Sequence, residues 1–107
     1  MSDKAIKVAH CKAGTVANIS LWEDVTVFLD PNNAKNQLIQ VALERDVEPY
    51  GKVVDWYAYD EVHVQNDHGA IIDQTIQIHG TFRYLRVVST YNGQQELPFI
   101  VSGKVSK

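Results

Sequence analysis

The chain has 107 residues and a net charge of −3, and its ten Lys and Arg residues are scattered, which argues against binding to nucleic acid through phosphates. Its apolar content of 45% and charged content of 21% are those of an ordinary globular protein, and its length predicts one domain over residues 1–107. Cys11 is the only cysteine, which excludes an internal disulfide, and no apolar run reaches the roughly 18 residues of a membrane span.

The N-terminal part alternates between apolar and polar residues, which is the pattern of half-buried strands. We expect a first strand over Lys4–His10, with Ile6 and Val8 facing the core. A second alternating stretch covers Thr15–Leu21, and the β-branched run Val25–Leu29 predicts a third strand.

The segment 33–45 is open to two interpretations. The alternation over Gln37–Arg45 indicates a strand. A short helix is the alternative, because Asp30 could cap it, Pro31 could occupy its first position, and good helix formers follow. We choose the strand, because the rest of the chain is β and an isolated helix would need a sheet face to cover.

Two further strands are expected over Val53–Tyr59, with Trp56 facing the core, and over Ala70–Ile78, with Ile72 facing inward. Turn residues separate these short strands at intervals near those of all-β folds. The chain therefore predicts an all-β, antiparallel β-sandwich of jelly-roll or immunoglobulin-like type with eight or nine short strands.

The best strand of the sequence is Thr81–Thr90, which carries β-branched and aromatic residues on both faces and so predicts a central strand. Asn92-Gly93 is a strong hairpin signal that predicts a tight turn into a closing strand over Leu97–Val105. Since Pro98 cannot donate a ladder hydrogen bond, we expect this closing strand to begin at an edge or a bulge.

The titratable residues form no familiar catalytic or metal motif. His63 and His68 flank Asp67, but their spacing matches no common zinc motif. The neighbouring carboxylates Asp60 and Glu61 would point to opposite faces of a strand rather than converge on a cleft. We therefore expect no enzyme activity, with no catalytic residue, no metal ligand and no cofactor.

Four tyrosines are the candidate contact residues, because tyrosine combines a large apolar area with a polar tip and suits protein interfaces. We prefer core or interface packing for them, and a sugar-stacking platform is the alternative role. The four candidates are Tyr50, Tyr57, Tyr59 and Tyr91.

Three stretches carry a likeness to a known group of proteins. They are Leu38–Asp46 (LIQVALERD), the strand around Trp56, and Gly80–Val88 (GTFRYLRVV) with the strand that closes the chain. Over Leu38–Val105 the chain resembles small β-sandwich structural proteins of tailed bacteriophages, of the decoration (cement), neck or tail-associated type. The most specific part of the resemblance is Phe82–Val88.

The resemblance implies a non-enzymatic virion protein, made in the host cytoplasm, that stabilises a particle by binding neighbouring subunits. Its partners would be major capsid, neck or tail proteins and further copies of itself, and neither nucleic acid nor membrane. The alternative is a carbohydrate-binding β-sandwich module that binds glycan as a monomer. Such a module would need an exposed coplanar pair among its aromatics, namely Tyr50, Tyr57, Tyr59, Tyr91 and Trp22.

Overall fold

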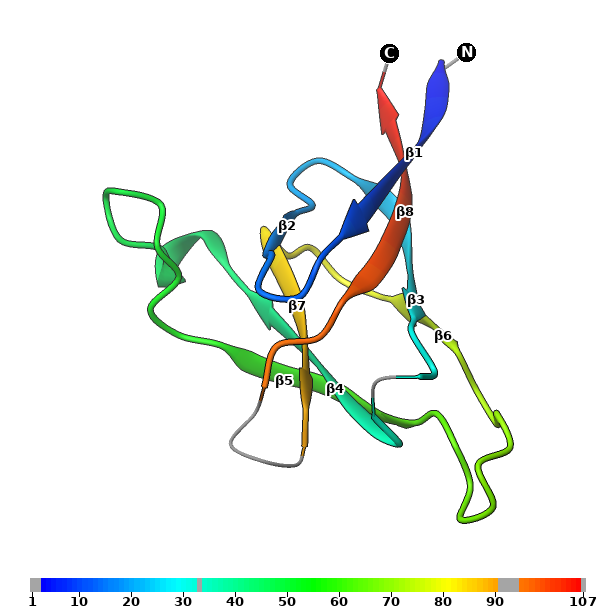
Figure 1. Ribbon diagram of the computed structural model, residues 1–107. Coiled ribbons are helices and arrows are strands. Elements are labelled where there is room, and N and C mark those ends of the chain that lie inside the picture. Colours follow the sequence, from blue (N-terminus) through cyan, green and yellow to red (C-terminus); the bar gives the residue numbers. More distant parts are fainter. Residues whose placement is uncertain (1–2, 33, 91–94, 107) are drawn as a thin grey trace.

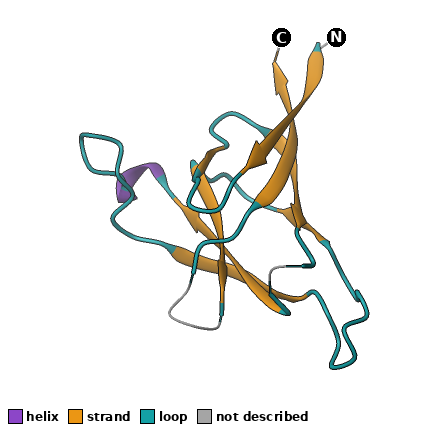
Figure 2. Cartoon of the chain, in the orientation of Figure 1, coloured by secondary structure: helices purple, strands orange, loops and turns teal. Residues whose placement is uncertain are grey.

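The protein is a sandwich of two four-stranded antiparallel sheets, which confirms the predicted all-β class (Figure 1). The computed structural model describes residues 3–32, 34–90 and 95–106. Figure 2 shows one short helical turn among the strands and loops of this part of the chain. The elements are β1 (Lys4–Cys11), β2 (Ala17–Asn18), β3 (Glu23–Leu29), β4 (Asn36–Ala42), the 3₁₀ turn η1 (Glu44–Asp46), β5 (Tyr57–His63), β6 (Thr75–Ile78), β7 (Tyr84–Ser89) and β8 (Phe99–Ser106).

The strand pairing is that of one long antiparallel ribbon folded back on itself. Strand β1 pairs with β8, β2 with β7, β3 with β6, and β4 with β5. Rolling up this ribbon adds the pairs β3–β8 and β4–β7, so the sheet orders are β1-β8-β3-β6 and β2-β7-β4-β5. This topology is a jelly roll, which decides between the two sandwich types that the sequence left open.

The core lies between the sheets and is built from aliphatic side chains of the inward faces. Strand β7 lies between β2 and β4, as predicted for a central strand. Its residues Leu85 and Val87 are fully buried in the core, and Val88 on its other face is fully buried as well. Burial on both faces explains why this strand is apolar almost throughout.

The predicted strand over Gln37–Arg45 is confirmed up to Ala42, since β4 buries Ile39 and Val41 in the core, but Glu44 and Arg45 belong to η1 instead. Among the described residues, helical structure is confined to η1, which follows this strand. There the Asp46 carboxylate accepts a hydrogen bond from the Leu43 N–H at 3.0 Å.

Strand β1 faces the opposite way from the prediction. Ile6 and Val8 lie on its outer face, with 68% and 52% of their surface exposed. The smaller residues Ala9 and Cys11 face inward instead and pack on the core. The prediction was wrong because the alternation fits either orientation, and the core at this edge of the sheet takes the small side chains.

The hairpin predicted after β7 is short, because the chain changes sheets after residue 97. Residues 95–97 continue the antiparallel pairing with residues 87–89, through backbone bonds of 2.7 and 2.9 Å. Pro98 then marks the crossing, and from Phe99 onwards β8 lies between β1 and β3, not at an edge. The Asn92-Gly93 turn lies outside the described residues.

Four predicted strands are shorter than expected or shifted, and one of them is Thr81–Thr90, of which only Tyr84–Ser89 forms β7. The stretch Thr15–Leu21 contains only the two residues of β2, and Leu21 is exposed with a φ of 66°. The prediction for Val53–Tyr59 is displaced, because β5 begins only at Tyr57 and contains a bulge in its pairing with β4. Within Ala70–Ile78 only the last four residues form a strand, and Ile72 is exposed instead of facing inward.

Candidate interaction surface

Tyr59 is a structural residue that ties the two sheets together at their β5 and β6 edges. Its hydroxyl accepts a hydrogen bond from the His79 N–H at 2.8 Å and donates one to the Gln77 carbonyl at 3.2 Å. Its ring meets Phe82 edge-on, with the centroids 5.9 Å apart. A side chain of the same molecule therefore bonds the Gln77 carbonyl of β6 and the N–H of His79, which follows β6.

The other predicted tyrosines have different neighbours. The Tyr57 hydroxyl accepts a hydrogen bond from Arg45 Nη2 at 3.2 Å, and this bond raises the pKa of the Arg45 guanidinium above its ordinary value. Tyr50 lies in the loop before β5 and is 96% exposed. Tyr91 lies outside the described residues. Tyr59, Tyr57 and Tyr50 thus point to β6, to η1 and to solvent respectively.

Replacing Tyr59 by phenylalanine should lower the free energy of unfolding by about 0.5–1.5 kcal/mol, the usual net worth of a hydrogen bond. The same change should speed amide exchange at His79, because its N–H loses the hydroxyl acceptor. Tyr57→Phe is the control, since its hydroxyl contacts η1 and not β6. Unchanged exchange at His79 in Tyr59→Phe would contradict this role.

The outer face of the β2-β7-β4-β5 sheet is covered by its own side chains. The Arg86 guanidinium lies 4.4 Å from the centre of the Trp56 ring and donates hydrogen bonds to Gln40 Oε1 at 2.7 Å and Glu96 Oε1 at 3.0 Å. Beneath this layer Gln40 is buried. Trp56 was predicted to face the core, but it lies on this outer face because the residues before β5 form a loop.

The outer face of the β1-β8-β3-β6 sheet carries exposed apolar side chains instead. Directly opposite residues in an antiparallel pair share a face, and Ile100 is opposite His10 on one side and Phe28 on the other. Phe28 is 40% exposed, and Ile6 and Val8 project from the same face. We call Ile6, Val8, Phe28 and Ile100 the outer patch.

A groove of about 450 Å³ adjoins the outer patch where β3 ends and β8 begins. Its lining includes Phe28, Pro98 and Ile100, together with His10. Cys11 approaches the groove from the core side, and burial raises the pKa of its thiol. A raised pKa keeps this thiol protonated at neutral pH, so it adds apolar surface and not a nucleophile.

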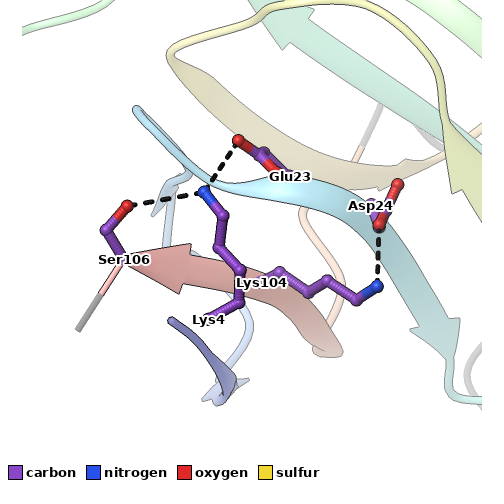
Figure 3. Close-up of polar contacts among 5 residues, drawn as sticks. All are labelled: Lys4, Glu23, Asp24, Lys104 and Ser106. Atoms are coloured by element: carbon purple, nitrogen blue, oxygen red, sulfur yellow. Dashed lines mark hydrogen bonds and ion pairs between the residues drawn. The ribbon is translucent and has the colours of Figure 1, made fainter. Parts of the chain in front are cut away.

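Ion pairs lie at the opposite end of the outer patch (Figure 3). The Lys4 ammonium reaches across β8 to the Glu23 carboxylate at 3.0 Å and also contacts the Ser106 hydroxyl at 3.5 Å. The Lys104 ammonium pairs with Asp24 at 3.2 Å. The outer patch is thus a group of apolar side chains bordered by polar ones, since β8 places Ser102 opposite Val8 and Lys104 opposite Ile6.

Sequence reasoning missed the outer patch, because it placed Ile6 and Val8 in the core. A signal was present in the other face of the same strand. Ala9 and Cys11 belong to the residue types that are most often fully buried, and both occupy the inward positions of β1.

The fold assigns the chain to the class of jelly-roll β-sandwiches. No family model matches it, and no curated protein or solved structure does so either. In the described ranges, no three His, Cys, Asp or Glu side chains come together to hold a metal ion. The same residues include no helix that is long and apolar enough to cross a membrane.

Proposed function

We propose that the chain is a non-enzymatic virion structural protein, a capsid decoration (cement) or neck- or tail-associated protein that stabilises a particle by binding neighbouring subunits. The observation that carries the proposal is the outer patch. Single exposed apolar residues are common on soluble proteins, whereas several apolar side chains gathered on one face indicate an interaction site. Burying it against another chain would remove this apolar surface from water.

The contrast between the two sheets supports this proposal. The β2-β7-β4-β5 sheet covers its outer face with the stacked pair Arg86 and Trp56, so it needs no partner there. The β1-β8-β3-β6 sheet leaves Ile6 and Val8 exposed. Modest contacts of this kind become strong when many copies bind one rigid lattice, because each bound contact raises the effective concentration of the next.

The jelly-roll fold agrees with the proposal and also with the carbohydrate-binding alternative, because both viral capsid proteins and lectins use this fold. The aromatic side chains favour the structural proposal. A sugar site needs exposed flat rings, but Tyr59 and Trp22 are partly buried and pack on the core. Tyr50 remains fully available, without a coplanar neighbour among the other described tyrosines.

The test measures whether the chain stays bound to virus particles produced from the genome that encodes it. The wild-type chain should sediment with purified particles and resist washing. Phe28→Lys places a charge in the outer patch and should be lost from them. Val54→Lys is the matched control, since Val54 is an exposed apolar residue in the loop before β5.

Absence of the wild-type chain from the particles would contradict the proposal, as would equal retention of Phe28→Lys. Cooperative thermal unfolding of each variant must first show that it is folded. Binding of the monomer to a glycan array, with no particle retention, would favour the carbohydrate-binding alternative.

A further inference from the structure

We propose that two copies of the chain pair through the free edge of β1, antiparallel and about a twofold axis at Val8, so that two four-stranded sheets become one sheet of eight strands. This inference deepens the proposed function, because it names a second copy of the chain as the partner at the β1 side of the outer patch. The inference depends on the proposed function in one respect, namely that the outer patch is a surface through which copies assemble.

Three of the four sheet edges are closed within a single copy. Strand β2 has only two residues. On β6 the Tyr59 hydroxyl occupies backbone groups of Gln77 and His79. Strand β5 is bulged, and the Asp60 carboxylate accepts the Glu61 N–H at 2.8 Å. Short strands, bulges and capping of backbone groups are the usual ways of protecting an edge from pairing.

The edge of β1 is regular, and no other strand among residues 3–32, 34–90 and 95–106 pairs with it. All eight of its residues pair with β8 without a register shift, so its other side presents a straight row of backbone groups. Lysines often protect such an edge, but here both point back onto their own copy. Figure 3 shows Lys4 directed to Glu23, and the Lys7 ammonium lies 5.8 Å from the centre of the Trp22 ring.

The charge of Lys7 and the number of paired residues determine the register between the two β1 strands. Directly opposite residues share a face. The twofold axis must therefore pass midway between one residue of β1 and the same residue of the second copy. An axis at Lys7 would place two ammonium groups opposite each other, and like charges in this position are destabilising. An axis at Val8 instead sets Lys7 opposite Ala9.

An axis at Val8 also gives the longer pairing. It aligns the seven residues Ala5–Cys11 with their counterparts, whereas an axis at Ile6 or Ala9 aligns only five residues of β1. Val8 then meets Val8 of the second copy on the outer face. Each Ile6 lies two residues from the axis and opposite His10 of the second copy, so the two outer patches meet along the new strand pair. The contact is self-complementary and closes at two copies.

Charge variants at position 8 test both the pairing and the axis. By light scattering behind a sizing column, the wild type and the control Val54→Lys should have twice the monomer mass of 12.1 kDa. Val8→Lys alone and Val8→Glu alone should each be monomeric, because like charges then meet at the axis. An equimolar mixture of the two should restore the doubled mass, because opposite charges meet there.

A monomeric wild type, or a dimeric Val8→Lys, would overturn the pairing, and failure of the mixture to dimerise would overturn the axis at Val8. Particle retention separates these results from the proposed function. Retention of a monomeric wild type, with loss of Phe28→Lys, would reject only the β1 pairing. A dimer that is absent from the particles would reject only the proposed virion function.

Discussion

Replacing Leu85 by alanine is expected to lower the free energy of unfolding by about 2–5 kcal/mol, the range found for truncating a fully buried leucine. Leu85 is 0% exposed and belongs to the core cluster. Its strand β7 lies between two others, so the cavity cannot be filled by a shift at an edge. Denaturant unfolding measured at equilibrium gives the change directly.

Ile72→Ala is the matched control, because Ile72 is an exposed aliphatic residue in the loop before β6. We expect its effect to stay within about 0.5 kcal/mol, as for most surface substitutions. A loss below about 1 kcal/mol for Leu85→Ala would contradict the central place of β7, because it would fall short of any buried-leucine truncation.

Gly103→Ala should lower the free energy of unfolding by about 1–3 kcal/mol, because overpacking forces neighbouring groups to move. A Cβ atom at this position would lie 2.8 Å from Cε3 of the Trp22 ring and 3.3 Å from the Glu23 carbonyl oxygen. Neither group is the flexible end of a side chain. The glycine is required here because the Trp22 ring packs directly on the β8 backbone.

Two comparisons make this second prediction specific. Ser102→Ala on the same strand should have a small effect, because Ser102 lies on the outer face, half-buried. In a Trp22→Leu background the penalty of Gly103→Ala should shrink, because the clashing ring atom is gone and contacting residues are not additive. An equal penalty in both backgrounds would contradict the packing of Trp22 on Gly103.

The fold class could be predicted from local alternation, since each strand of a two-layer sandwich hides one face. The stretch 81–90 was identified as a central strand because both its faces are apolar, and the structure confirms this with Leu85 and Val88. The choice of strand over helix in 33–45 was also correct, because only a strand fits a chain that is otherwise β.

The connections between strands could not be predicted, because they depend on partners far apart in the sequence. The chain crosses from one sheet to the other at Pro98 because β8 lies between β1 and β3. The local sequence pattern does not indicate which strands β8 pairs with. The bulge in β5 shifts its pairing with β4 and so displaces the strand predicted around Trp56. Alternation alone would not reveal an extra residue in one strand.

The sequence predicted that the chain has a contact surface, but it did not predict which residues form that surface. The tyrosines were chosen by composition, but Tyr59 forms an internal tie and Tyr57 contacts η1. The outer patch escaped prediction because alternation gives the spacing of a strand's faces without saying which face is inside. In β1 the larger side chains, Ile6 and Val8, turned out to be the outer ones.

Amide hydrogen exchange of the chain, free and bound to particles, tests most directly whether another chain covers the outer face of the β1-β8-β3-β6 sheet. We predict that binding slows exchange in Glu23–Leu29, the strand that carries Phe28, whereas Lys4–Cys11 is already paired in the free dimer. Unchanged exchange in Glu23–Leu29, or new protection confined to the loops 47–56 and 64–74, would contradict this.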